Sequence, residues 1–128
     1  MKKIMLLTIA TLFNAAHAEW SWLQKIDNQS SCTLQLIEHT QSLYVAVHNA
    51  PSTIPPYSEG FIETMGTEES QYVNGYAVIC NKQPVGIGQI YDNNWEEDDY
   101  LFFQGNGISW EHESFFHFYP GTILVANK

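Results

Sequence analysis

Apolar side chains recur at every second position through much of this chain, and this spacing restricts its fold more than any other feature. Cys32, Leu34 and Leu36 alternate with polar residues, and Leu43, Val45 and Val47 continue the pattern. Alternation with a period of two is typical of half-buried β-strands, and no long stripe with helical spacing occurs. The segments rich in aromatic and β-branched residues are predicted strands: 20–26, 32–36, 43–47, 60–65, 72–80, 85–91, 100–104, 108–111, 115–119 and 122–126.

Turn-forming residues separate these segments. Asn81-Lys82-Gln83-Pro84 and Gly105-Asn106-Gly107 each lie between two apolar runs, and both are predicted to be hairpin connections, the second allowing a positive φ at each glycine. Pro51 and the pair Pro55-Pro56 interrupt the chain before the next strand. About eight to ten short strands punctuated by turns predict an all-β fold, a single antiparallel β-sandwich; a small β-barrel is the alternative.

The first 18 residues have the three parts of a signal peptide. Lys2 and Lys3 form a basic start, residues 4–13 are uncharged and mostly apolar, and Ala16-His17-Ala18 offers a cleavage site. We therefore expect an exported protein, periplasmic or extracellular, with a signal peptide at 1–18 and a single β domain at 19–128. The apolar run is shorter than the roughly 20 residues that span a bilayer, so no transmembrane segment is expected in the mature chain.

Two cysteines, Cys32 and Cys80, lie in the predicted mature chain. In an exported protein an even pair indicates a disulfide bond, although two free thiols remain the alternative. A bond between these cysteines would close the loop from residue 32 to residue 80. In the chain-entropy model this closure would stabilise the fold by about 4 kcal/mol.

The charge of the chain excludes one class of partner. It contains 14 acidic and 5 basic residues, for a formal net charge of −9, and no arginine. Binding to nucleic acid requires several lysines or arginines to neutralise phosphates, so no nucleic-acid partner is expected. Attraction to anionic lipid is disfavoured for the same reason.

The densest acidic stretch runs from Asp92 to Asp99 and includes Glu96, Glu97 and Asp98. Oxygen-bearing side chains at alternate positions are compatible with calcium, but the glycine and the bidentate glutamate of a calcium loop are missing. A solvated acidic loop is the simpler interpretation.

The histidines of the predicted mature chain, His39, His48, His112 and His117, show no zinc-ligand spacing, so no metal site or cofactor is predicted.

No motif in the sequence indicates a catalytic site. A nucleophile elbow is absent, and scattered Ser, His and Asp residues carry no information without geometry. Glu111 and Glu113 share one strand face, which is more typical of a solvated strand than of a glycosidase pair. We therefore expect a non-catalytic protein.

Aromatic residues crowd the C-terminal third of the chain. Some must enter the core, but Trp and Tyr also suit a ligand platform because each has an apolar body and a polar tip. Trp95, Tyr100 and Trp110 are the predicted ligand-binding residues, placed in aromatic loops that would contact neutral lipid headgroups or sugar rings.

Several segments occur in an order that resembles a known family. Residues 20–26 are followed by Asn28, the stretch 54–56 leads to Gly60-Phe61, and residues 74–76 precede the run from Gly88 to Asn94. This order resembles that of the aegerolysin-like proteins, which implies a small acidic β-sandwich that binds membranes. The chain departs from the family by its cysteine pair and by lacking a Trp-Gly-Lys stretch, so no lipid-binding residue is carried over.

Two functions from different classes follow from these observations. The first is a recognition module that binds membrane lipid or glycan through the aromatic loops. The second is a protein-binding inhibitor or envelope accessory domain that presents the acidic loop to a basic partner.

Overall fold

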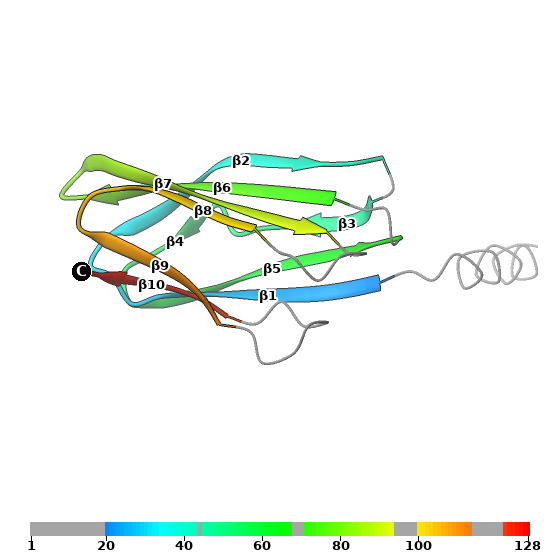
Figure 1. The fold of residues 1–128 in the computed structure, drawn as a ribbon, viewed down its shortest axis with the longest axis horizontal. Helices are drawn as coiled ribbons and strands as arrows, with labels where there is room; N and C mark the ends of the chain where they lie inside the picture. The colour runs from blue at the N-terminus through cyan, green and yellow to red at the C-terminus, as the bar shows by residue number, and fades with distance from the viewer. Residues whose placement is uncertain (1–19, 44, 68–70, 94–99, 114–121) are drawn as a thin grey trace, which may run out of the picture.

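The computed structural model of the chain describes residues 20–43, 45–67, 71–93, 100–113 and 122–128. These residues form strands joined by short connections (Figure 1). The strands are β1 (Trp20–Asn28), β2 (Thr33–Gln41), β3 (Val45–Asn49), β4 (Thr53–Ile54), β5 (Ser58–Gly66), β6 (Gln71–Cys80), β7 (Gln83–Asn93), β8 (Tyr100–Gly105), β9 (Ile108–Glu113) and β10 (Thr122–Asn127).

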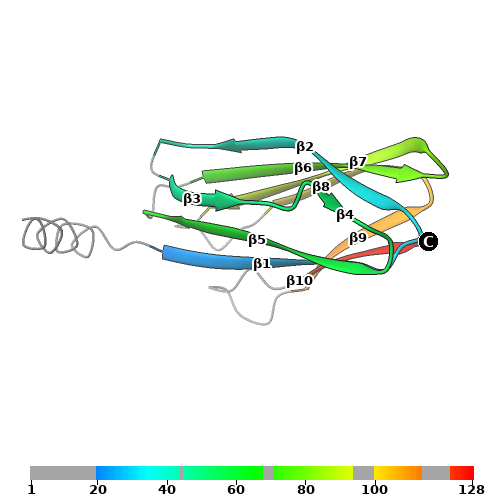
Figure 2. The ribbon, with the colours of Figure 1, turned by 180° about the vertical axis from the view of Figure 1, so that it is seen from behind.

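The strands form two facing five-stranded sheets, which confirms the all-β prediction and is consistent with a sandwich. One sheet, called sheet A here, has the order β3-β5-β1-β10-β9, and the other, sheet B, has the order β4-β2-β6-β7-β8. The two layers can be followed from both sides in Figures 1 and 2. Among the described residues neither sheet closes on itself, so the barrel alternative is not supported. One pairing departs from the antiparallel expectation, because β1 and β10 run parallel.

Two connections that were both predicted to be hairpins differ in the structure. The turn between β6 and β7 is a hairpin, as predicted: Cys80 pairs with Gln83, and both Asn81 and Lys82 have positive φ, 51° and 64°. The hairpin predicted at residues 105–107 was wrong, because β8 belongs to sheet B and β9 to sheet A, whereas the predicted positive φ is found at both Gly105 and Gly107. This segment crosses between the layers, and Gly107, with φ of 78°, supplies the left-handed turn that the crossing requires.

The predicted disulfide between Cys32 and Cys80 is present, with the two Cα atoms 4.6 Å apart. It joins neighbouring strands of sheet B, since Thr33 pairs with Ile79 next to it. We call this end of the sandwich the disulfide end; it also carries the β6–β7 turn and the β8–β9 crossing, on the left in Figure 1. The opposite end, where β2 ends and β6 begins, is called the histidine end after His48.

The apolar core fills the disulfide end and the middle of the sandwich. Its most enclosed aliphatic members come from both sheets: Ile26, Leu34, Ile54, Ile62, Val78, Ile90, Ile123 and Val125. They occupy alternate positions of their strands, as the period-two pattern predicted.

The remaining expectations about secondary structure are met in part. The other predicted strands are found, with bounds that differ by a few residues, whereas the predicted strand 115–119 lies outside the described residues. Over the part of the chain that the structure describes, no helix is long and apolar enough to cross a membrane.

Candidate functional site

The predicted acidic and aromatic loop is described only at its two edges. Trp95, Glu96, Glu97, Asp98 and Asp99 lie outside the described residues. Asp92 lies near the end of β7, where it pairs with Tyr72, and Tyr100 begins β8 opposite Tyr91. Both strand positions lie at the histidine end of sheet B.

Trp110 is a core residue, which corrects its prediction as a ligand contact in an aromatic loop. It lies on β9 with 8% of its surface exposed, and its ring stacks on Phe103 with ring centroids 5.8 Å apart. Gly88 provides the space for it, because a Cβ at that position would lie 2.5 Å from the indole ring. The aromatic pattern alone did not reveal this, because a buried and an exposed tryptophan have the same spacing on a strand.

His48 joins the two sheets at the histidine end. It lies on β3 of sheet A, but its ring reaches residues of sheet B: Nδ1 is 3.1 Å from Gln41 Oε1, and Nε2 is 3.0 Å from Asn74 Oδ1. The rings of His39 and Tyr72 pack edge-on against it, with centroids 3.9 Å and 5.1 Å away. His48 and Asn74 are buried, whereas His39 and Gln41 are exposed.

The surroundings of His48 disfavour its charged form. Its pKa is lowered from 6.5 to about 4, chiefly because burial penalises the charged ring and secondly because His39 repels a second positive charge. The hydrogen bond with Asn74 opposes this shift. His48 is therefore neutral at pH 7, so only one of its two ring nitrogens carries a hydrogen and can donate to an amide oxygen.

Further buried polar residues lie on sheet A at the histidine end. Gln24 and Thr64 are buried on β1 and β5, with 3% and 1% of their surfaces exposed. The Gln24 side chain donates to the Lys25 carbonyl oxygen, 3.2 Å away. The Thr64 hydroxyl has no hydrogen-bond partner within the described part of the chain. The histidine end is thus filled largely by groups that hydrogen-bond, in contrast to the apolar disulfide end.

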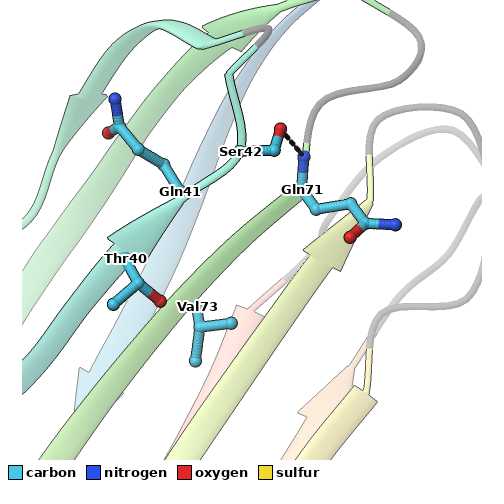
Figure 3. Close-up of a pocket in the computed structure, with 5 residues that line it drawn as sticks. All are labelled: Thr40, Gln41, Ser42, Gln71 and Val73. Atoms are coloured by element: carbon cyan, nitrogen blue, oxygen red, sulfur yellow. Dashed lines mark hydrogen bonds between the residues drawn. The ribbon is translucent and has the colours of Figure 1, made fainter.

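A hollow of about 270 Å³ opens at the histidine end of sheet B (Figure 3). Thr40 and Val73 pair across β2 and β6 at its floor, and the Gln71 amide N–H donates to Ser42 Oγ, 3.0 Å away. The Gln41 side chain extends away from the other four lining residues, on the side where it meets His48. Among the residues that line the hollow, hydroxyl and amide groups surround one valine, and none is charged.

An exposed tyrosine lies beside this hollow. Tyr91 pairs with Val73 in the β6–β7 ladder, so the two side chains share the outer face of sheet B. Tyr91 is 37% exposed, and its hydroxyl donates to Gln89 Oε1, 3.3 Å away. Gln89 in turn donates to Glu38 Oε1 at 2.7 Å, which ties β7 to β2. We call Thr40, Ser42, Gln71, Val73 and Tyr91 the sheet B site.

The sheet B site can form hydrogen bonds and a ring contact, but it shows no catalytic arrangement. In the described segments, no three His, Cys, Asp or Glu side chains gather where they could hold a metal ion. The sequence analysis did not single out this site, because its members are ordinary residues of strands or, for Ser42, of the chain just after a strand. Only the register of β2, β6 and β7 brings them together.

The comparisons with known proteins add no family assignment, since neither a protein-family model nor a curated protein sequence matches this chain.

Proposed function

We propose that this chain is an exported, non-catalytic recognition module that binds a neutral glycan at the sheet B site. The observation that carries the proposal is the uncharged hollow beside an exposed tyrosine. The signal-peptide pattern of residues 1–18 and the Cys32–Cys80 disulfide support export, because disulfides persist in oxidising compartments.

The chemistry of the site suits a sugar. Sugar hydroxyls both donate and accept hydrogen bonds, as do the hydroxyl groups of Thr40 and Ser42 and the amide of Gln71. The C–H face of a pyranose ring is apolar, and an exposed tyrosine such as Tyr91 offers a flat apolar surface with a polar tip. A ring lying on Tyr91 would direct its hydroxyls toward the hollow.

Charge favours a neutral sugar over an acidic one. The chain has a formal net charge of −9, and the carboxylate of Glu38 lies on the same face of sheet B. An anionic glycan or lipid would be repelled by both. A neutral lipid headgroup is the competing ligand, and the test below separates it from a sugar.

The test is a panel of immobilised neutral and acidic oligosaccharides probed with the purified protein, followed by calorimetric titration of the best ligand. Phosphatidylcholine vesicles form a parallel arm. We expect binding to a neutral sugar, and we expect Tyr91→Ala and Thr40→Val each to weaken it at least about tenfold, which is 1.4 kcal/mol.

Matched controls are available at the disulfide end. Tyr57 is exposed there, and Thr53 is exposed on β4, so Tyr57→Ala and Thr53→Val should leave the affinity unchanged. Binding to vesicles but to no sugar would reject the glycan in favour of a lipid headgroup. Sugar binding that is insensitive to Tyr91→Ala and Thr40→Val would reject the sheet B site.

A further inference from the structure

Large apolar side chains lie exposed on the outer surface of sheet A, which faces away from sheet B. Leu23 of β1 and Phe61 of β5 are 57% and 47% exposed, although both strands have a neighbouring strand on each side. The residues that follow them, Gln24 and Ile62, are buried, so the alternation of the strands directs Leu23 and Phe61 outward. The packing of the two sheets therefore does not require a large apolar side chain at either position.

The outward apolar residues form a continuous stripe across three strands. Val47 of β3 pairs with Met65 of β5, and both side chains are half-buried. Leu23 pairs with Glu63 of β5, so it lies diagonally between Met65 and Phe61, and diagonal neighbours are within reach of long side chains. We call Val47, Met65, Leu23 and Phe61 the sheet A stripe. Isolated apolar residues on a surface need no explanation, whereas a contiguous exposed group is typical of an interaction site.

Carboxylates alternate with the apolar side chains along β5. The outward positions of this strand are, in order, Glu59, Phe61, Glu63 and Met65. Alternate residues of a strand lie about 7 Å apart, so acidic and apolar groups follow each other at this spacing.

The outer surface of sheet A has more negative than positive groups. Lys25 of β1 bonds Glu59 at 2.9 Å. Glu63 and Asp27 accept hydrogen bonds from uncharged amide side chains, at 3.1 and 3.0 Å, and Glu111 is exposed on β9. Among the side chains that the structure describes, three carboxylates on this surface thus remain beyond the one that Lys25 neutralises.

We propose that the sheet A stripe binds an extended basic segment of another protein, whose side chains facing the sheet alternate between lysine or arginine and a large apolar residue. An extended segment has the same two-residue spacing as β5. Its cationic side chains would meet carboxylates such as Glu63, and its apolar side chains would pack on Leu23 and Phe61.

The charge of the surface disfavours other occupants. A second copy of the chain on the sheet A stripe would bring like charges together, and an anionic membrane would be repelled in the same way. The stripe lies on the opposite sheet from the sheet B site, so this proposal does not require that the sheet B site bind a glycan.

The test uses three short peptides of equal length, added to isotope-labelled protein while NMR chemical shifts are followed. The matching peptide alternates lysine and leucine at every second position, with threonine between them. One control peptide has serine in place of leucine, and the other has glutamate in place of lysine. We expect the matching peptide to shift amide signals of β1 and β5 and to bind at least about tenfold more tightly than either control. Its affinity should fall as salt is added.

Variants locate the contact. Leu23→Ser and Phe61→Ser should each weaken binding of the matching peptide at least about tenfold, and Glu63→Gln should reduce the salt dependence. Ile87→Ser is the matched control, because Ile87 is 44% exposed on β7 of sheet B, and it should leave the affinity unchanged. All four positions are exposed, so the variants are expected to fold, which their spectra report directly.

Four results would overturn the proposal. They are no binding of the matching peptide, equal binding of either control peptide, shifts that fall on β7 instead of β1 and β5, and an affinity that neither Leu23→Ser nor Phe61→Ser reduces. Concentration-dependent dimerisation that Phe61→Ser abolishes would also overturn it, because a second copy would then occupy the stripe. No sugar is present in these measurements, so this proposal and the glycan binding can fail independently.

Discussion

The two ends of the sandwich use the same two sheets but are held together in different ways. At the disulfide end the sheets enclose aliphatic side chains, and neighbouring strands of sheet B are bridged covalently. At the histidine end they enclose His48, Asn74, Thr64 and Gln24, which must find hydrogen-bond partners there. Apolar packing is insensitive to pH, whereas a buried histidine is not, so the two ends should respond differently to acid.

The disulfide end also contains the buried polar residues Asn28 and Ser30, and the surroundings of Asn28 show how such a group is stabilised. Asn28 donates to the carbonyl oxygens of Cys32 and Pro55, at 2.8 and 2.9 Å, and it accepts hydrogen bonds from Ser30. These contacts connect the end of β1 to the residue just before β2 and to the residue just after β4. The hydrogen-bonding capacity of Asn28 is filled, whereas Thr64 at the other end has a hydroxyl without a partner in the described region.

Removing the disulfide should lower the free energy of unfolding more than any of the changes described below. The double variant Cys32→Ala/Cys80→Ala is expected to lower the free energy of unfolding by about 4 kcal/mol, because the unfolded chain regains the freedom of the loop between the cysteines. Urea titration measures it. A loss below about 1 kcal/mol would mean that the apolar core alone holds the disulfide end.

Asn28→Ala should have the second largest effect. It leaves buried carbonyl oxygens at the disulfide end without a donor, and we expect a loss of about 3 kcal/mol in the free energy of unfolding. Asn49→Ala is the control, since Asn49 is exposed and donates to Glu63 at the surface. Equal small losses in both variants would contradict the importance of the Asn28 contacts.

Acid should destabilise the protein through the histidine end. Because the pKa of His48 is lowered to about 4 from 6.5, the folded protein binds fewer protons than the unfolded chain between these values. The contribution of the neutral His48 ring to the free energy of unfolding is complete above pH 6.5 and is lost as the pH falls toward 4. Between pH 7 and pH 4.5 the unmodified protein should lose about 5 °C more in Tm than His48→Gln. Parallel Tm curves for the two proteins would argue against this assignment.

The smallest effect should be a gain in stability. Thr64→Val keeps the shape of the side chain and removes a buried hydroxyl that has no partner among the described residues. We expect the free energy of unfolding to rise by about 1 kcal/mol, measured by urea titration. Thr53→Val, at an exposed position, should change it by less than about 0.5 kcal/mol. A destabilised Thr64→Val would mean that the hydroxyl is hydrogen-bonded in solution.

The strands could be predicted because burial on one face of a sheet imposes a local pattern. Leu34 is buried at one of the alternate positions, and the turn at Asn81-Lys82 has the residues and the length of a hairpin. The membership of each strand in a sheet could not be predicted in the same way. Gly105-Asn106-Gly107 joins two layers, and a glycine-rich turn has the same composition whether it reverses a strand or crosses a sandwich.

The candidate site was less accessible to sequence reasoning. The environment of His48 is created by Gln41, 7 residues away in sequence, and Asn74, 26 residues away, which meet it only across the two sheets. Trp110 was assigned to the surface because its neighbours are aromatic, whereas the structure places its ring against Gly88. In both cases the deciding contact is between sheets, and periodicity reports only which face of its own sheet a residue occupies.

The parallel pairing of β1 with β10 has a consequence for the order in which the molecule is made. Lys25 of the first strand pairs with Thr122 of the last, and β10 lies between β1 and β9. Sheet A therefore stays divided until nearly the whole polypeptide has been synthesised, and its closing contacts span almost the full length of the domain. Contacts of such long range slow folding. Slow folding would suit the export that we propose, because a chain that is still unfolded can pass through a narrow protein-conducting channel.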